Sequence, residues 1–198
     1  MLDILGRHHG TDKASNGHDY LDWYERFISD FREKPAWIFE MGVFGGDSLR
    51  MWRDFFPLGN IIGLDLVPEA KQYSEERIIV ETGDQSDSDV LNAVMDKYGP
   101  FDVIIDDAGH DPAAQLFSFK YLFPAMSAGG YYLLEDIWIP EVVNFFADLG
   151  AAVVQLGSTN NLARLCETIS FHREAVIIQR NRLYPVRRRA WELRMDGR

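Results

Sequence analysis

Short apolar runs alternate with longer amphipathic segments along most of the chain. The runs are three to six residues long, and most are rich in isoleucine, valine and aromatic residues, which is typical of buried strands. Seven strands are therefore predicted, at residues 37–41, 61–66, 78–80, 101–105, 131–134, 151–154 and 175–179. Apolar residues at helical spacing predict helices at residues 48–56, 87–97, 112–126 and 140–149. This alternation predicts an α/β fold with a doubly wound, mostly parallel seven-stranded sheet and helices on both of its faces.

The length and composition are those of an ordinary globular domain. The chain has 198 residues, of which 46% are hydrophobic and 26% are charged, so disordered and fibrous classes are excluded. We expect one domain over residues 1–198. Within it, residues 1–30 are expected to form an N-terminal helix or lid segment, and residues 181–198 a basic tail.

The charge is acidic and unevenly distributed. The 31 acidic and 20 basic residues give a net charge of −11. Residues 180–198 hold seven arginines and two acids, a net of +5, which leaves −16 on residues 1–179. Because such an acidic body repels phosphate backbones, we expect no nucleic-acid partner.

The cysteine content and the hydropathy favour a reducing compartment. The single cysteine, Cys166, excludes an internal disulfide framework and a thiolate zinc cluster. The first ten residues lack the apolar core of a signal peptide, and no run approaches the about 18 apolar residues of a membrane span. We therefore expect a cytoplasmic protein with no membrane partner.

Acidic residues follow most of the predicted strands. In doubly wound sheets, ligands bind beyond the carboxyl ends of the strands, where the strand order reverses. Each of the first five strands ends at or near a carboxylate, and these residues are Glu40, Asp65, Asp84, Asp106, Asp107, Glu135 and Asp136. We expect them to gather at one edge of the sheet and to form the functional site.

A glycine-rich turn, Glu40-Met-Gly-Val-Phe-Gly-Gly46, follows the first strand. Its spacing differs from the dinucleotide fingerprint, and it lacks the Lys-Ser/Thr of a phosphate-binding loop. The acids Glu40 and Asp47 disfavour a pyrophosphate and favour a ligand with a cationic amino group. Asp65, at the end of the second strand, suits ribose hydroxyls. Together these residues indicate S-adenosylmethionine. The alternatives are that the glycines only turn the chain and Asp65 caps a loop, or that Asp65 binds NAD in an oxidoreductase.

A second group of carboxylates is expected where the fourth and fifth strands end. Its members are Asp106, Asp107, Glu135 and Asp136. Carboxylates packed this closely repel one another, and a divalent cation with oxygen ligands, most simply Mg²⁺, relieves the repulsion. His110 is then placed to take a proton from a hydroxyl bound to that ion. The alternative is that Asp107 and Asp136 cap the helices that begin near residues 112 and 140.

Several segments, in their order along the chain, resemble those of a known family. They are His9-Gly-Thr-Asp-Lys13, His18-x-Tyr20, Glu40 to Leu49, Met51-Trp52, Gly63-Leu-Asp65, Gly83 to Asp87, Ile104 to His110 and Glu135-Asp136. These segments resemble class I S-adenosylmethionine-dependent O-methyltransferases of the macrocin O-methyltransferase type, which methylate sugar hydroxyls. The sequence departs from the family at Ala108 and Gly109, where glycine and serine are common.

The resemblance implies a role for each matching residue. The implied donor-binding residues are Glu40, Gly42, Asp65, Asp84, Gln85, Asp106, Thr11 and Lys13, the last two as part of a cover over the donor. The implied Mg²⁺ ligands are Asp107, Glu135 and Asp136, and the implied general base is His110. The expected reaction is Mg²⁺-dependent methyl transfer from S-adenosylmethionine to a sugar hydroxyl, on a small molecule or an oligosaccharide. A phenol or catechol acceptor and an NAD-dependent oxidoreductase are the alternatives.

Acceptor recognition is expected in residues 1–30, in the loop after the fifth strand and in an insertion at residues 157–170. In that loop Trp138 is placed to stack on a substrate ring, with a core position as the alternative. We also expect a homo-oligomer, with a dimer as one option. Trp23, Tyr24 and Phe27 are interpreted first as the apolar face of a helix, with a pocket wall or a dimer contact as alternatives.

The remaining polar candidates are assigned to structural or surface positions. His8, His9 and His18 are expected on the surface or in the lid, and His172 in a structural position. The run Arg187 to Arg189 is expected to be solvated, with oligomer contacts or anionic substrate binding as alternatives.

Overall fold

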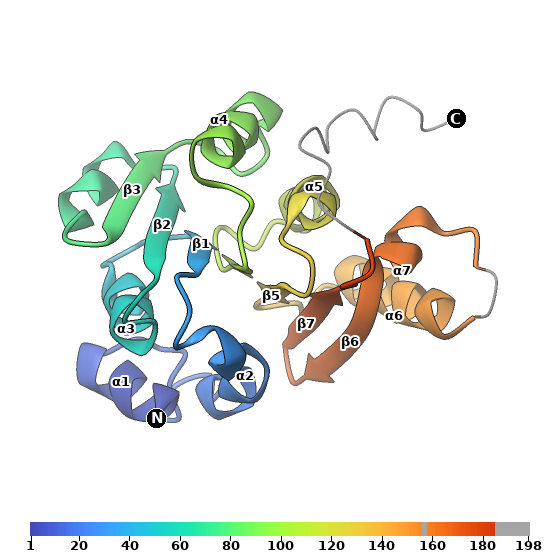
Figure 1. Ribbon diagram of the computed structural model, residues 1–198, viewed down its shortest axis with the longest axis horizontal. Helices are drawn as coiled ribbons and strands as arrows, with labels where there is room; N and C mark the ends of the chain where they lie inside the picture. Colours follow the sequence, from blue (N-terminus) through green and yellow to red (C-terminus); the bar gives the residue numbers. More distant parts are fainter. Residues whose placement is uncertain (156–157, 185–198) are drawn as a thin grey trace.

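A single seven-stranded sheet, in the order β3-β2-β1-β4-β5-β7-β6, runs through the molecule (Figure 1). The computed structural model describes residues 1–155 and 158–184. The strands are β1 (Trp37–Met41), β2 (Asn60–Asp65), β3 (Ile78–Thr82), β4 (Val103–Asp106), β5 (Tyr131–Leu134), β6 (Cys166–His172) and β7 (Ala175–Arg180). Strands β1 to β5 are parallel, whereas β7 is antiparallel to β5 and β6. The predicted doubly wound, mostly parallel sheet is confirmed.

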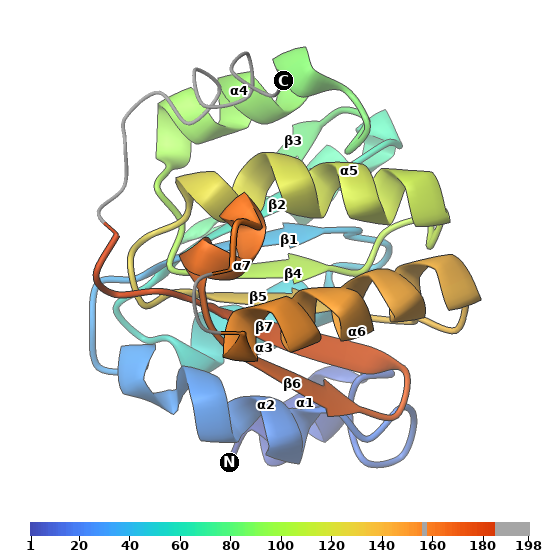
Figure 2. The same cartoon turned by 90° about the vertical axis from the view of Figure 1, so that its right-hand side faces the viewer.

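Helices cover both faces of the sheet (Figure 2). On one face lie α1 (Leu2–His9), α2 (Leu21–Ile28) and α3 (Asp47–Phe55); on the other lie α4 (Ser88–Tyr98), α5 (Pro112–Leu122) and α6 (Pro140–Val154). The shorter helical segments are η1 (Ser29–Phe31), η2 (Pro68–Tyr73), η3 (Phe123–Ala125) and α7 (Asn161–Leu165). Within the described part of the chain, no helix has both the length and the hydropathy needed to cross a bilayer.

The central strands are buried on both sides. On β1, Phe39 packs into the apolar cluster beneath α4, α5 and α6, whereas Ile38 packs into the cluster beneath α1, α2 and α3. Burial on both faces explains why these strands have continuous apolar runs. The apolar face predicted for the N-terminal helix is confirmed, because Tyr24 is fully buried while Trp23 and Phe27 pack against the same cluster.

One of the seven predicted strands is wrong. Residues 151–154 form the last turn of α6, because Gly150 does not end that helix. Gly150 is open to a side chain: apart from its chain neighbours and the helix's own backbone, no described atom lies within 4 Å of a Cβ built there. The missing strand is β6, at the edge of the sheet, where polar and apolar residues are mixed. β6 has no continuous apolar run, which is the signal on which the prediction relied. The expected insertion at residues 157–170 therefore holds, in its described part, α7 and most of β6.

The strand order reverses at β1, which pairs with both β2 and β4. Phe39 lies opposite Ile62 on one side and Ile104 on the other. The loops that leave these neighbouring strands therefore diverge, and a crevice opens between them at the carboxyl edge. Most of the predicted site residues lie at this edge. The basic tail lies outside the described residues from position 185 onward, and this includes the run Arg187 to Arg189.

Candidate active site

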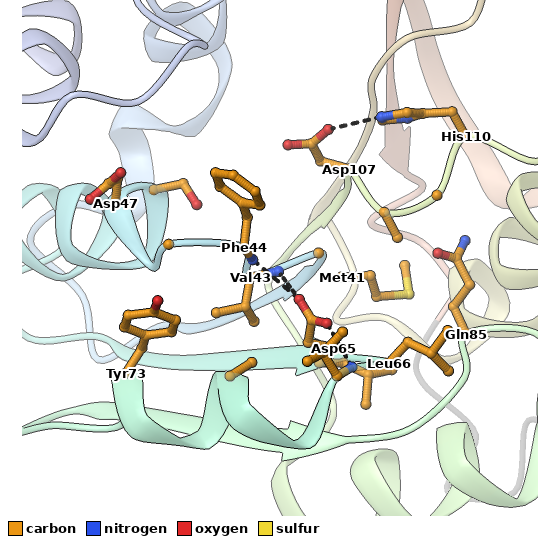
Figure 3. Close-up of a pocket in the computed structure, with 18 of the residues that line it drawn as sticks. Met41, Val43, Phe44, Asp47, Asp65, Leu66, Tyr73, Gln85, Asp107 and His110 are labelled. Carbon is orange, nitrogen blue, oxygen red and sulfur yellow. Dashed lines mark hydrogen bonds and ion pairs between the residues drawn. The ribbon is translucent and has the colours of Figure 1, made fainter.

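A cavity of about 920 Å³ opens at the carboxyl ends of β1, β2, β3 and β4 (Figure 3). Its walls come mainly from residues 10–13, 41–45, 64–67, 83–86 and 107–111. The volume is in the range of small-molecule binding sites. The predicted site residues that line the cavity are Thr11, Lys13, Gly42, Asp65, Asp84, Gln85, Asp107 and His110; the others, Glu40, Asp106, Glu135 and Asp136, lie outside its walls.

The glycine turn is held tightly against the loop that follows β4. Gly42 has a φ of 94°, in the left-handed region that favours glycine. A Cβ atom at this position would lie 2.0 Å from the carbonyl oxygen of Asp107. Gly42 is therefore required both for the direction of the turn and for the close approach of the two loops that form the cavity floor.

Replacing Gly42 with alanine is expected to lower the free energy of unfolding by about 2–4 kcal/mol, because the side chain adds backbone strain and a clash with backbone that cannot move aside. Urea unfolding measures this loss. The matched control is Gly45→Ala, whose Cβ would meet only the Asp47 side chain, at 3.4 Å. Equal losses in the two variants would contradict the close-approach role of Gly42.

Asp65 stabilises the same turn from the end of β2. Its Oδ2 accepts hydrogen bonds from the backbone N–H groups of Val43, at 2.8 Å, and Phe44, at 3.1 Å, and its Oδ1 accepts one from Val67, at 2.9 Å (Figure 3). The loop-capping alternative is thus confirmed as a contact. The same carboxylate lines the cavity, so contact with a ribose hydroxyl is compatible with this arrangement and remains a prediction.

Glu40 is fully buried at the end of β1. Its Oε2 accepts hydrogen bonds from the Ser48 hydroxyl, at 2.8 Å, and from the Trp52 indole N–H, at 3.1 Å. Its Oε1 has no hydrogen-bond donor among the described residues. Burial raises the pKa of Glu40 to about 7. Ser48 lines the cavity, so Glu40 acts on it through this hydroxyl.

Two residues on the glycine turn change the expected electrostatics and shape of the cavity. Asp47 is paired with Arg50 at 2.5 Å, so its charge is partly neutralised and disfavours a pyrophosphate less than the sequence suggests. Phe44 has a φ of 47° and its side chain is 96% exposed, although it lines the cavity. An exposed aromatic on strained backbone at a cavity wall is a candidate for ligand contact, and the sequence analysis did not identify it.

Asp106 is fully buried and contacts the cavity wall through Gln85. It accepts hydrogen bonds from the Ser118 hydroxyl at 2.5 Å, the Tyr132 hydroxyl at 2.7 Å and the Gln85 side-chain amide at 3.2 Å. Burial raises the pKa of Asp106 to about 6. Asp106 therefore orients Gln85, whose side chain lies in the cavity wall (Figure 3).

The rim of the cavity carries a carboxylate–histidine group. Asp107, His110 and Asp136 each place one ligand atom within 4.8 Å of the others. His110 Nε2 lies 3.4 Å from Asp136 Oδ2 and 3.9 Å from Asp107 Oδ1. Both His110 and Asp136 have a positive φ, 54° and 56°. Such backbone conformations are typical of functional sites.

The helix-capping alternative for the two aspartates is wrong. The N-cap of α5 is Asp111, whose carboxylate accepts the N–H of Ala114 at 2.9 Å. The N-cap of α6 is Ile139, which makes no side-chain cap. Asp107 and Asp136 are therefore free of a capping role at these helices.

Glu135 is separated from the rim group in this structure. Its Oε2 is bound to the ammonium group of Lys13 at 2.8 Å, and Lys13 also binds the Asp107 carboxylate. Of the three predicted metal ligands, Asp107 and Asp136 thus lie together in the structure, whereas Glu135 is paired with Lys13. Glu135 Oε1 makes no hydrogen bond among the described residues, and the buried Tyr24 hydroxyl, which makes none either, interacts with the same carboxylate.

The N-terminal segment reaches the same rim. The Tyr20 hydroxyl donates to Asp136 Oδ1 at 3.1 Å, and His18 Nδ1 lies 3.8 Å from the same oxygen. His18 also forms a second potential ligand group with Asp136 and Glu174. The His18-x-Tyr20 motif was the sequence signal for these contacts, although no role was predicted for Tyr20.

The rim also carries an exposed aromatic residue beside His110. The Trp138 side chain is 54% exposed, which excludes a core position, and its ring centroid lies 5.8 Å from that of His110.

The other histidines have structural contacts: His9 pairs with Asp54 at 2.8 Å, and His172 stacks on Trp23 with centroids 4.9 Å apart.

No family model matches the chain, but curated proteins do. The chain is 39% identical to mycinamicin VI 2''-O-methyltransferase of Micromonospora griseorubida over 144 residues. This aligned region covers 69% of the chain and 36% of the relative. The chain is 34% identical over 181 residues to demethylmacrocin O-methyltransferase of Streptomyces fradiae, 87% of this chain and 45% of the relative. The chain thus spans less than half the length of these relatives.

A solved structure matches the fold closely. The MycE methyltransferase from the mycinamycin biosynthetic pathway, in complex with Mg, SAH and mycinamycin VI, superposes with a TM-score of 0.85 at 30% sequence identity. The superposition covers 91% of this chain and 53% of the MycE chain.

Proposed function

Because this chain belongs to the family of macrocin-type S-adenosylmethionine-dependent O-methyltransferases and has their Rossmann-like fold, we propose that it transfers a methyl group from S-adenosylmethionine to a sugar hydroxyl with the help of Mg²⁺. The observation that carries the proposal is the position of the Asp107, His110 and Asp136 group, on the rim of a cavity at the strand-order reversal. The residues described here act as its methyltransferase domain.

The cavity suits the methyl donor. Thr11, Gly42, Asp65, Asp84 and Gln85 line its walls, and we assign them to donor binding. The acidic walls favour the cationic sulfonium and amino groups of S-adenosylmethionine. Glu40 and Asp106 serve the donor indirectly, because they hold Ser48 and Gln85 in place.

The rim suits a hard divalent ion. The donor set is made of carboxylate oxygens, which Mg²⁺ prefers, and Glu135 contributes an oxygen that makes no hydrogen bond among the described residues. We therefore assign Asp107, Asp136 and Glu135 as the residues that would hold the ion. Bound there, Mg²⁺ would orient the acceptor hydroxyl and lower its pKa. His110 removes the hydroxyl proton through Nε2, which faces the two aspartates. The oxygen then bonds to the methyl carbon as the sulfur–methyl bond breaks, and S-adenosylhomocysteine is the leaving group.

The acceptor is proposed to be a sugar carried on a natural product or an oligosaccharide. The curated relatives named above act, by their names, on mycinamicin VI and on demethylmacrocin. The exposed ring of Trp138 beside His110 offers a flat face for a sugar ring. Phenol and catechol acceptors are the runner-up. Homo-oligomer formation and a cytoplasmic location remain predictions of the sequence.

The reaction is tested with labelled S-adenosylmethionine and a panel of glycosylated acceptors, free sugars and phenols, with and without EDTA. We expect transfer to a glycosylated acceptor that EDTA lowers by about 100-fold or more and that added Mg²⁺ restores. Transfer indifferent to EDTA would contradict the Mg²⁺ assignment, and preference for a catechol would contradict the sugar assignment. Tight NAD binding without S-adenosylmethionine binding would overturn the methyltransferase proposal.

A further inference from the structure

The ammonium group of Lys13 is buried among the ends of three adjacent strands. The Lys13 side chain is 1% exposed. Its Nζ lies 2.8 Å from Glu135 Oε2 after β5 and 3.6 Å from Glu40 Oε1 on β1, and it also donates to Asp107 Oδ2 after β4. Lys13 itself comes from the segment between α1 and α2, so this one side chain joins the N-terminal segment to the carboxyl edge of the sheet.

Lys13 binds one oxygen of Asp107 and one oxygen of Glu135, and it leaves the second oxygen of each carboxylate unbound by its ammonium group. Asp107 Oδ2 accepts a hydrogen bond from Lys13, while Asp107 Oδ1 lies 3.9 Å from His110 Nε2. Glu135 Oε2 accepts a hydrogen bond from Lys13, while Glu135 Oε1 makes none among the described residues. The ammonium group thus fixes the rotation of both carboxylates and decides which oxygens remain available.

The charge of Lys13 is maintained in spite of its burial. Oxygens of the Asp107, Glu135 and Glu40 carboxylates lie within 3.6 Å of Nζ and compensate the buried positive charge. Without this cation, three carboxylates on neighbouring strand ends would face one another, and the two that are fully buried, Glu40 and Glu135, would have no compensating charge, which is strongly unfavourable.

We propose that Lys13 is a positioning residue of the metal site, which orients Asp107 and Glu135 and fastens the N-terminal segment over the cavity. The metal part of this proposal rests on the proposed function. This role replaces the donor contact that the family resemblance implies for Lys13. Two of the three N–H groups of the Lys13 ammonium are used by Asp107 and Glu135, and the carboxylate of Glu40 lies nearest to the third. Residues that hold metal ligands in place are typically worth a factor of about 10–100 in metal affinity.

The first test compares Lys13→Met with the wild type in three binding measurements. Mn²⁺ affinity by electron paramagnetic resonance is expected to fall about 10- to 100-fold, whereas S-adenosylhomocysteine affinity by calorimetry falls by a smaller factor, through Thr11 in the loosened segment. Hydrogen exchange of backbone amides in residues 10–20 is expected to speed up without any metal present. The matched control is Lys97→Met, which removes an exposed ion pair with Glu81 and is expected to change none of the three.

Rescue separates the charge of Lys13 from its packing. In Lys13→Ala, added ethylammonium is expected to recover Mn²⁺ affinity, whereas ethanol, a neutral molecule of similar size, is not. Equal recovery by ethanol would mean that Lys13 acts only by filling space. Unchanged or tighter Mn²⁺ binding in Lys13→Met would overturn the positioning role, and a selective loss of S-adenosylhomocysteine affinity would return Lys13 to the donor site.

A measurement on the unmodified chain covers the case in which the variants do not fold. The chain has five lysines, whose ammonium groups can be observed separately by ¹⁵N nuclear magnetic resonance. Mn²⁺ is expected to broaden the Lys13 signal first; a Lys13 signal no more affected than that of Lys97 would contradict the proposal. If the wild type binds no Mn²⁺, the proposed metal site fails, and metal-free hydrogen exchange then decides whether Lys13 still fastens the N-terminal segment.

Discussion

His110→Ala is expected to lower the turnover number by about 10²- to 10⁴-fold, the usual contribution of a general base. The reason is geometric: Nε2 of His110 faces the carboxylates that would hold the ion, at 3.4 and 3.9 Å, at the rim of the cavity. A hydroxyl at that position would lie within reach of the imidazole. Turnover is measured at saturating donor and acceptor, so that binding defects are separated from the loss of the base.

The binding properties of the same variant distinguish a base from a metal ligand. If His110 is the base, its loss leaves the affinities for S-adenosylhomocysteine and Mn²⁺ nearly intact. If His110 is a metal ligand, its loss lowers the affinity for Mn²⁺. The control is His9→Ala, because His9 pairs with Asp54 and lies outside the cavity walls. A fully active His110→Ala variant would refute the base assignment, and a loss of Mn²⁺ binding would reassign His110 as a ligand.

Asp136→Asn is expected to weaken Mn²⁺ binding by more than about 100-fold, above the range found for residues that only support ligands. The substitution keeps the shape of the side chain and removes its charge. Asp136 Oδ2 faces His110, and Oδ1 already accepts the Tyr20 hydroxyl, so the carboxylate is held in one orientation. Turnover should fall with the metal affinity and recover partly at high Mg²⁺ concentration.

The control for Asp136 is Asp111→Asn. Asp111 is also an acid near the rim, but it caps α5, and asparagine is an equally good N-cap. This variant should bind Mn²⁺ like the wild type. An equal loss in both variants would indicate that the acidic field, rather than coordination by Asp136, accounts for metal binding.

The fold was predictable where burial leaves a clear pattern. Strands β1, β2, β4 and β5 are buried on both faces, so their apolar runs are continuous, and the carboxylates that follow them could be placed at one edge. The strand predicted at 151–154 failed because a short apolar run fits the end of a helix equally well. The mixed polarity of β6 hid that strand for the opposite reason.

The candidate site was predictable as a set of residues but not as a set of contacts. Strand ends indicate which carboxylates gather, whereas the partner of each depends on segments distant in sequence. Lys13 reaches Glu135 across 122 positions, and Asp65 caps a turn that begins more than 20 positions earlier. The exposure of Phe44 and the burial of Asp106 likewise depend on packing, which residue type and spacing do not determine.

The most direct test of the central claim is a crystal structure of the chain with S-adenosylhomocysteine and Mn²⁺, with the metal located by anomalous scattering. We expect the nucleoside in the cavity beside the Gly42 turn and a metal peak bound by Asp107 and Asp136, with His110 outside the coordination shell. A ligand bound elsewhere, or a metal peak absent from these two aspartates, would contradict the account.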